Sequence, residues 1–249
     1  MTPVRITLLG LSAALAACAS ANDAPQPIPG NDARVDGPLG GADAAVTDAG
    51  FGIDAPPADA GIPRFTLQQT TLTASLPNGT VACSNSGTPR DNSWYRVFRL
   101  ADAGITGGAR ITAVSIGVQQ ASGFPTLDIK VGTYSGSVQP PPQTLDVGLI
   151  TPIASTTYTV PTITTSATQY VSVPLTANIP ALAQVIVEVS VPDLVGTGKT
   201  FFLGGNTGGQ SAPAYLRSTA CSYPQPRDTT TLDAVFASSH LVITATGTN

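Results

Sequence analysis

The sequence predicts an all-β protein, an antiparallel β-sandwich of jelly-roll type, preceded by a signal segment and a disordered linker. Over residues 64–249, short runs rich in β-branched and aromatic residues recur between turn signals. Several runs alternate apolar and polar side chains with a period of two, and long amphipathic helical periods are absent. Such runs leave one apolar face per strand, which becomes buried when two sheets pack together.

The alternation is clearest in residues 185–191, where every second residue is valine and Glu188 and Ser190 fall on the opposite face. It is also clear in residues 111–116. About ten antiparallel strands in one domain favour a sandwich. The predicted strands are Phe65–Leu76, Trp94–Leu100, Arg110–Gln120, Thr126–Tyr134, Leu149–Val160, Gln169–Leu175, Ala183–Val191, Thr200–Gly204, Ala214–Arg217 and His240–Gly247.

The start of the chain has the composition of an export signal. The apolar stretch Ile6–Ala17 is shorter than the ~20 residues that a permanent transmembrane helix needs. It ends in Leu15-Ala16-Ala17-Cys18, which resembles the lipobox of bacterial lipoproteins. The resemblance implies that residues 1–17 are a signal peptide, that cleavage occurs before Cys18, and that fatty acids attached to Cys18 hold the protein at a membrane.

Two fatty chains attach a protein stably without a transmembrane segment, because each buried methylene contributes ~0.8 kcal/mol. Alanine, and not aspartate, follows Cys18, which by resemblance to enterobacterial sorting favours the outer membrane. A second interpretation stays open: cleavage after Ala19-Ser20-Ala21 removes Cys18 and gives a soluble secreted protein.

Residues 18–63 form the predicted linker. From residue 19 onward, 32 of its 45 positions are Ala, Gly, Pro or Asp. Such a segment cannot bury enough apolar surface to offset its chain entropy, so we expect a disordered tether. Seven Asp against Arg34 give the tether a charge of −6, whereas residues 64–249 carry only +1 and Arg5 adds +1, which gives the net charge of −4. A nearly neutral domain gives no support for a nucleic-acid partner.

Two cysteines remain once Cys18 is assigned to the lipobox. Cys83 and Cys221 lie in turn-rich segments, and in an exported chain we expect them to form a disulfide. A bond between Cys83 and Cys221 would close a long loop of the chain, which stabilises the fold by roughly 5 kcal/mol in the chain-entropy model. Two free thiols are the alternative. Neither cysteine has a CxxC partner and the chain has one histidine, so no metal site is predicted.

Three aromatic residues are candidates for ligand binding. Trp94, Tyr95 and Tyr215 have the ring types that stack on the apolar face of a sugar, although core packing or sheet support is the better explanation for them. The glycine-rich loop around Asn206 is a further candidate, because glycines let the backbone approach a ligand closely. No cofactor-binding motif accompanies these residues; the half-match to a phosphate loop near Gly198 is better explained as a hairpin turn.

A catalytic role has weaker support. His240 is the only histidine, and it opens a predicted strand with no G-x-S-x-G elbow elsewhere. Glu188 is the only glutamate of the domain, and the aspartates are scattered over separate segments. A hydrolase with a scattered Ser/His/Asp triad or with two paired carboxylates stays open as an alternative, because such sites have no fixed spacing.

Several segments together resemble an uncharacterised all-β module of exported bacterial proteins. The leader and tether resemble those of lipoproteins from myxobacteria and their relatives. The module implies no known ligand or catalytic residue. The segments that carry its resemblance are Asn92–Phe98, Ile111–Val118, Phe201–Asn206, Gly209–Leu216 and His240–Ile243.

The sequence therefore predicts a surface lipoprotein that displays a non-catalytic binding or adhesion module. Its expected partners are the membrane, through the lipid, and a polysaccharide or an envelope protein. A hydrolase and a purely structural envelope component are the alternatives. The ligand and the oligomeric state do not follow from the sequence.

Overall fold

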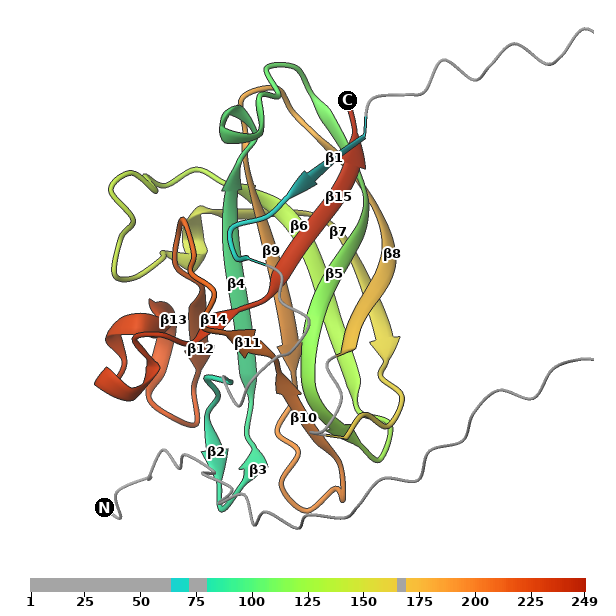
Figure 1. Ribbon diagram of the computed structural model, residues 1–249, viewed down its shortest axis with the longest axis vertical. Helices are drawn as coiled ribbons and strands as arrows, with labels where there is room; N and C mark the ends of the chain where they lie inside the picture. The colour runs from blue at the N-terminus through green and yellow to red at the C-terminus, as the bar shows by residue number, and fades with distance from the viewer. Residues whose placement is uncertain (1–63, 72–79, 165–168) are drawn as a thin grey trace, which may run out of the picture. The chain divides into compact units, whose positions relative to one another are not determined.

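The structure is a computed structural model that describes residues 64–71, 80–164 and 169–249. Two antiparallel sheets dominate it (Figure 1). The five-stranded sheet contains β1 (Arg64–Leu67), β5 (Ala109–Ser122), β8 (Gln169–Ile179), β10 (Thr200–Leu203) and β15 (Ile243–Thr248). The six-stranded sheet contains, in spatial order, β13 (Tyr223–Asp228), β12 (Tyr215–Ser218), β4 (Asn92–Arg99), β9 (Gln184–Val191), β6 (Thr126–Tyr134) and β7 (Ile150–Thr159).

The smaller elements lie between these strands. Two short pairs, β2 with β3 and β11 with β14, add two-stranded ribbons. The strands are β2 (Ser84–Asn85), β3 (Thr88–Pro89), β11 (Gly205–Asn206) and β14 (His240–Leu241), and the 3₁₀ turns are η1 (Leu100–Ala103), η2 (Val147–Leu149), η3 (Thr229–Thr231) and η4 (Ala234–Phe236).

The order of the strands is that of a jelly roll. From β4 to β10 the chain passes from sheet to sheet at every step except between β6 and β7, which are paired neighbours. The resulting order β4-β9-β6-β7 places strands side by side that are far apart in sequence. This is the interleaving of Greek keys that defines a double-sheet jelly roll, so the predicted fold class is confirmed.

The main core fills the space between the two sheets. Alternate residues of each strand point into this core, such as Val185, Val187 and Val189 of β9, which are all fully buried. Trp94 of β4 meets Phe201 of β10 edge to face, with ring centroids 5.8 Å apart. The indole N–H of Trp94 donates to the carbonyl of Val81 at 2.7 Å, which satisfies the one polar atom of this side chain.

All ten predicted runs contain strands, but their ends differ. The first run begins one residue late, and β1 ends at Leu67; part of the predicted run through Leu76 lies outside the described residues. The prediction missed β2, β3, β11 and β13. Three of these are two residues long. The fourth, β13, contains Pro224 and Pro226, which disfavour a central strand and are tolerated on this edge strand of the sheet.

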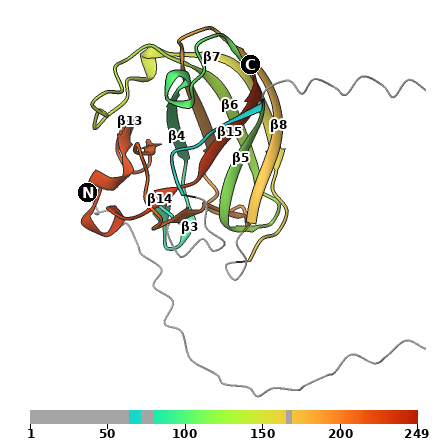
Figure 2. The same cartoon turned by 45° about the horizontal axis from the view of Figure 1, so that its top comes forward.

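A long loop, residues 135–149, covers part of the outer face of the six-stranded sheet (Figures 1 and 2). Backbone hydrogen bonds fix it to β13: the Leu145 N–H donates to Pro226, and the Asp228 N–H donates to Gln143. Its buried side chain Leu145 belongs to a second apolar cluster, on the side of the sheet away from the main core. The loop therefore covers part of a face that would otherwise be open to solvent.

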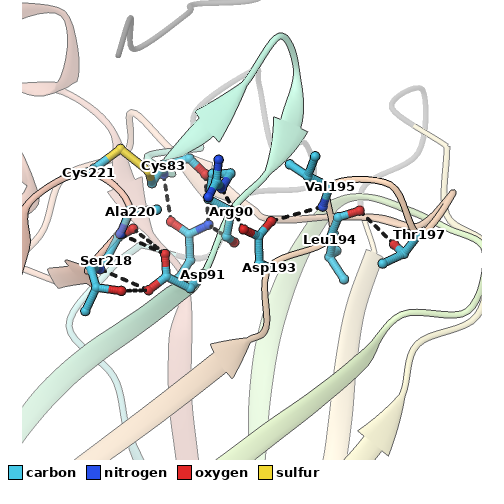
Figure 3. Close-up of polar contacts among 12 residues, drawn as sticks. Cys83, Arg90, Asp91, Asp193, Leu194, Val195, Thr197, Ser218, Ala220 and Cys221 are labelled. Carbon is cyan, nitrogen blue, oxygen red and sulfur yellow. Dashed lines mark hydrogen bonds and ion pairs between the residues drawn. A yellow bond between two sulfur atoms is a disulfide. The ribbon is translucent and has the colours of Figure 1, made fainter. Parts of the chain in front are cut away.

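The predicted disulfide is confirmed. Cys83 and Cys221 are bonded, with their Cα atoms 5.9 Å apart (Figure 3). Next to it, the Asp91 carboxylate accepts hydrogen bonds from Ser218, Thr219 and Ala220, on the segment that leads to Cys221. Burial alone would raise the pKa of Asp91, but these hydrogen bonds outweigh it and leave the pKa below its usual value.

The leader, Cys18 and the tether all lie outside the described residues. Their assignments therefore remain predictions. Within the part of the chain that the structure describes, no helix is long and apolar enough to cross a membrane.

Candidate functional site

The four residues proposed from sequence as ligand contacts are all buried. Trp94, Tyr95, Asn206 and Tyr215 each expose 2% or less of their surface. A sugar-stacking platform requires an exposed ring face, so these side chains do not form the exposed platform that the sequence suggested. The sequence left open which side of β4 is buried, and the structure shows that both sides are.

The two sides of β4 are buried by different partners. Trp94 and Phe98 point into the main core. Tyr95 and Val97 point outward and pack with Tyr215 under the loop of residues 135–149. No periodicity reveals this, because the cover comes from a loop more than thirty residues further along the chain.

Asn206 has a structural role. Its side-chain N–H donates to the carbonyl of Thr71 at 2.7 Å, and its carbonyl accepts from the N–H of Gly208. In the same loop, the Gly209 N–H donates to Nδ1 of His240. These contacts join the glycine-rich loop to the segment after β1 and to β14. Burial, and then the charge of Arg96, lower the pKa of His240, so this nitrogen accepts in the neutral form.

Arg96 holds the same region together from the inner side of the sheet. It is fully buried, and every contact that it makes is to a neutral acceptor: the carbonyls of Leu241 and Ala212 and the amide oxygens of Gln69 and Gln210. Burial lowers its pKa to about 9. The guanidinium is thus a hydrogen-bonding hub between four chain segments, and sequence periodicity gave no signal for it.

The open half of the outer face carries a groove of about 530 Å³ beside the loop. This size lies within the ~300–1,000 Å³ typical of ligand sites. Its apolar wall is formed by the residues of β7 and β9 and the end of the loop: Val147, Ile150, Pro152, Ile153 and Ile186. Its polar wall is formed by the side chains Tyr95, Lys130, Ser155, Glu188 and Arg217.

The strand register explains why these polar groups meet. Tyr95 of β4 is opposite Glu188 of β9, which is opposite Lys130 of β6, which is opposite Ser155 of β7. We call these four residues the charged row. The Tyr95 hydroxyl donates to Glu188 Oε1 at 3.0 Å, and Lys130 Nζ lies 3.3 Å from Glu188 Oε2.

A second row runs parallel to the first, two residues further along each strand. It crosses β12, β4, β9, β6 and β7 and consists of paired positions that all point outward. We call it the hydroxyl row: Arg217, Ser93, Ser190, Asp128 and Thr157. Asp128 and Thr157 are exposed and joined by a hydrogen bond of 3.0 Å, and the other three are partly exposed.

Within the charged row, the surroundings of Tyr95 change the pKa of its hydroxyl. Burial, and then the negative charge of Glu188, raise the pKa of Tyr95 to about 12. The phenol therefore remains a proton donor at physiological pH. Its partner Glu188 lines the groove and is partly exposed, with 16% of its side-chain surface accessible.

A Ser/His/Asp triad built on His240 is not formed among the described residues. No ion pair or hydrogen bond joins His240 to a carboxylate in residues 64–71, 80–164 and 169–249. Over the same ranges, no group of three or more His, Cys, Asp or Glu side chains is placed to hold a metal ion. The polar groups of the groove are suited to hydrogen bonding with a ligand that both donates and accepts.

No family model and no curated protein matches the chain. Among solved structures, one match contains the cysteine protease and lectin-like domains of Cwp84, a surface layer associated protein of Clostridium difficile, at 13% sequence identity and a TM-score of 0.46. The alignment covers 75% of this chain and 36% of that chain, so this chain spans about a third of the solved one.

Proposed function

We propose that this chain is a lipid-anchored protein of the bacterial envelope whose β-sandwich is a non-catalytic module that binds a polysaccharide. The observation that supports it best is the groove on the outer face of the six-stranded sheet. There, an apolar wall faces the charged row and Arg217, and the rest of the hydroxyl row lies on the same strands next to it. A sugar has the matching chemistry, because its ring presents apolar C–H faces and its hydroxyls both donate and accept hydrogen bonds.

The rigidity of the groove also supports binding. Its polar side chains stand on paired strands, and the Lys130–Glu188–Tyr95 chain of contacts holds three of them in position before a ligand arrives. A pre-organised site loses less side-chain entropy on binding. An envelope protein is the other partner that the sequence left open, and the binding experiment below distinguishes the two.

The binding proposal is tested with the full-length chain purified in detergent. The probe is the polysaccharide fraction of a bacterial envelope, immobilised and treated with protease. We expect binding that Lys130→Ala weakens at least about five-fold. Lys199→Ala is the matched control, since Lys199 is the other partly exposed lysine of the domain and lies outside the groove. The proposal is contradicted if the chain binds the untreated fraction but not the protease-treated one, or if both variants weaken binding equally.

The anchoring proposal is independent and is tested in cells. The full-length chain expressed with radiolabelled palmitate is expected to carry the label and to sediment with membranes. Cys18→Ser is expected to lose both properties. An unlabelled wild-type chain that begins after residue 21 and accumulates in the medium contradicts the anchor and supports cleavage at the second site.

A further inference from the structure

We propose that the ligand of the groove is an uncharged polysaccharide and that its chain runs across the strands, along the charged and hydroxyl rows. This inference rests on the proposed function and makes it specific. It names the class of ligand, the direction in which the ligand lies and the length of ligand that fills the site.

The direction follows from the register. Each row is a set of directly paired residues, so it runs perpendicular to the strands. The hydroxyl row crosses five strands, from Arg217 on β12 to Thr157 on β7. At one inter-strand spacing per step, this is about 19 Å. A chain laid along the strands would instead leave the polar rows after two residues and meet the apolar side chains next to the loop.

The charge class follows from the balance within the rows. Two cations, Arg217 and Lys130, stand among two anions, Glu188 and Asp128. All four already have a protein partner. Lys130 contacts Glu188, and Asp128 accepts from Thr157. Arg217 donates through Nε to the carbonyl of Pro224 and also reaches the Tyr95 hydroxyl.

An anionic polymer would be attracted by the two cations but repelled by Glu188 and Asp128. A cationic polymer would be attracted by the two anions but repelled by Lys130 and Arg217. A neutral sugar has no such penalty, because each hydroxyl can donate to a carboxylate and accept from the neighbouring ammonium or guanidinium. Hydrogen bonds to charged partners contribute more than hydrogen bonds between neutral groups. Alternating fixed charges therefore select a ligand that is rich in hydroxyls and has no charge of its own.

The first experiment compares three soluble polymers of similar length with the full-length chain: a neutral glucan or mannan, a polyuronate and chitosan. Binding is measured by isothermal titration calorimetry at 20 mM and at 300 mM salt. We expect the neutral polymer to bind at least about ten-fold more tightly than either charged one, with less than a two-fold change between the salt concentrations. Salt screens net charge attraction between exposed groups, so such a small change identifies a neutral ligand.

Tighter binding of the polyuronate that is lost at high salt overturns this inference and leaves the proposed function intact. Binding of the envelope polysaccharide fraction without any preference for the neutral polymer also overturns this inference and leaves the proposed function intact. If no polysaccharide binds at all, the proposed function fails, and this inference fails with it.

The second experiment tests the direction with a series of neutral oligosaccharides of two to eight units. We expect affinity to rise until the oligosaccharide spans the hydroxyl row and then to level off. Thr157→Val, at the β7 end of the row, should weaken the long oligosaccharides about three- to five-fold and leave the disaccharide unchanged. Thr176→Val is the matched control, because Thr176 is exposed on β8 of the other sheet. Equal effects of Thr157→Val on all lengths, or of both variants on the long ones, overturn the proposed direction.

Discussion

The two faces of the six-stranded sheet differ in what covers them. The inner face packs against the five-stranded sheet over the length of β4, β9 and β6 and forms the main core. The outer face is covered over part of its area by the loop of residues 135–149, and the rest carries the polar rows and the groove. The inner face therefore supplies most of the buried apolar core, whereas the outer face carries the proposed ligand site.

The largest expected effect is at Trp94, on the inner face. Trp94→Ala removes a fully buried side chain and its contact with Phe201, and we expect a loss of about 3–5 kcal/mol in the free energy of unfolding. Urea unfolding of the full-length chain measures it. Tyr95→Phe is the counterpart on the outer face, and it should cost only about 1 kcal/mol because only a hydroxyl is lost. Equal losses for the two variants would break the comparison between the faces.

The second-largest expected effect on the free energy of unfolding comes from removing the disulfide. Replacing Cys83 and Cys221 together by serine removes a cross-link between residues 138 positions apart, and we expect a loss of about 2–4 kcal/mol. The same measurement in the wild-type chain with a reductant should give a similar value. Ligand binding in native buffer should change little, because neither cysteine lines the groove. A stability unchanged by both treatments shows that the bond is absent in the purified protein.

Leu145→Ala tests the cover of the outer face. The side chain is fully buried between the loop and the sheet, and we expect a loss of about 2 kcal/mol, at the low end for such a change because a loop can settle into the space. Limited proteolysis should then cleave within residues 135–149 before any strand is cut. Cleavage that begins in the core strands would show that the loop and the sandwich unfold as one unit.

The smallest expected effect is the pH dependence at Asp91. Its pKa is lower in the folded state than the unfolded value of about 3.9, so ionised Asp91 stabilises the fold above that pH. The contribution is lost as the pH falls through the folded-state pKa. Asp91→Asn should therefore lower the thermal midpoint at pH 7 by more than it does at pH 2.5. A constant difference over this range would show that the hydrogen bonds to Asp91 do not depend on its charge.

Much of the fold was predictable because strands are encoded locally. Period-two alternation placed the ten runs, and the count of cysteines gave the pair Cys83–Cys221. The short strands were missed because two residues carry no period. The candidate site was predicted poorly. Aromatic type pointed to Tyr95 and Tyr215, which are on strands of the outer face but are buried under the loop. No sequence feature singled out Lys130 or Ser155, which line the groove.

By itself, the sequence determined the fold class and the disulfide, because these depend on local period and residue count. The exported leader and the tether remain predictions from composition. Only the tertiary structure decided which side chains meet on the outer face. The row from Tyr95 to Ser155 joins four strands that are spread over more than ninety residues of chain, and its members become neighbours only through the register of antiparallel pairing. Long-range pairing of this kind leaves no pattern in any window of the sequence, so the groove had to be found in the folded molecule.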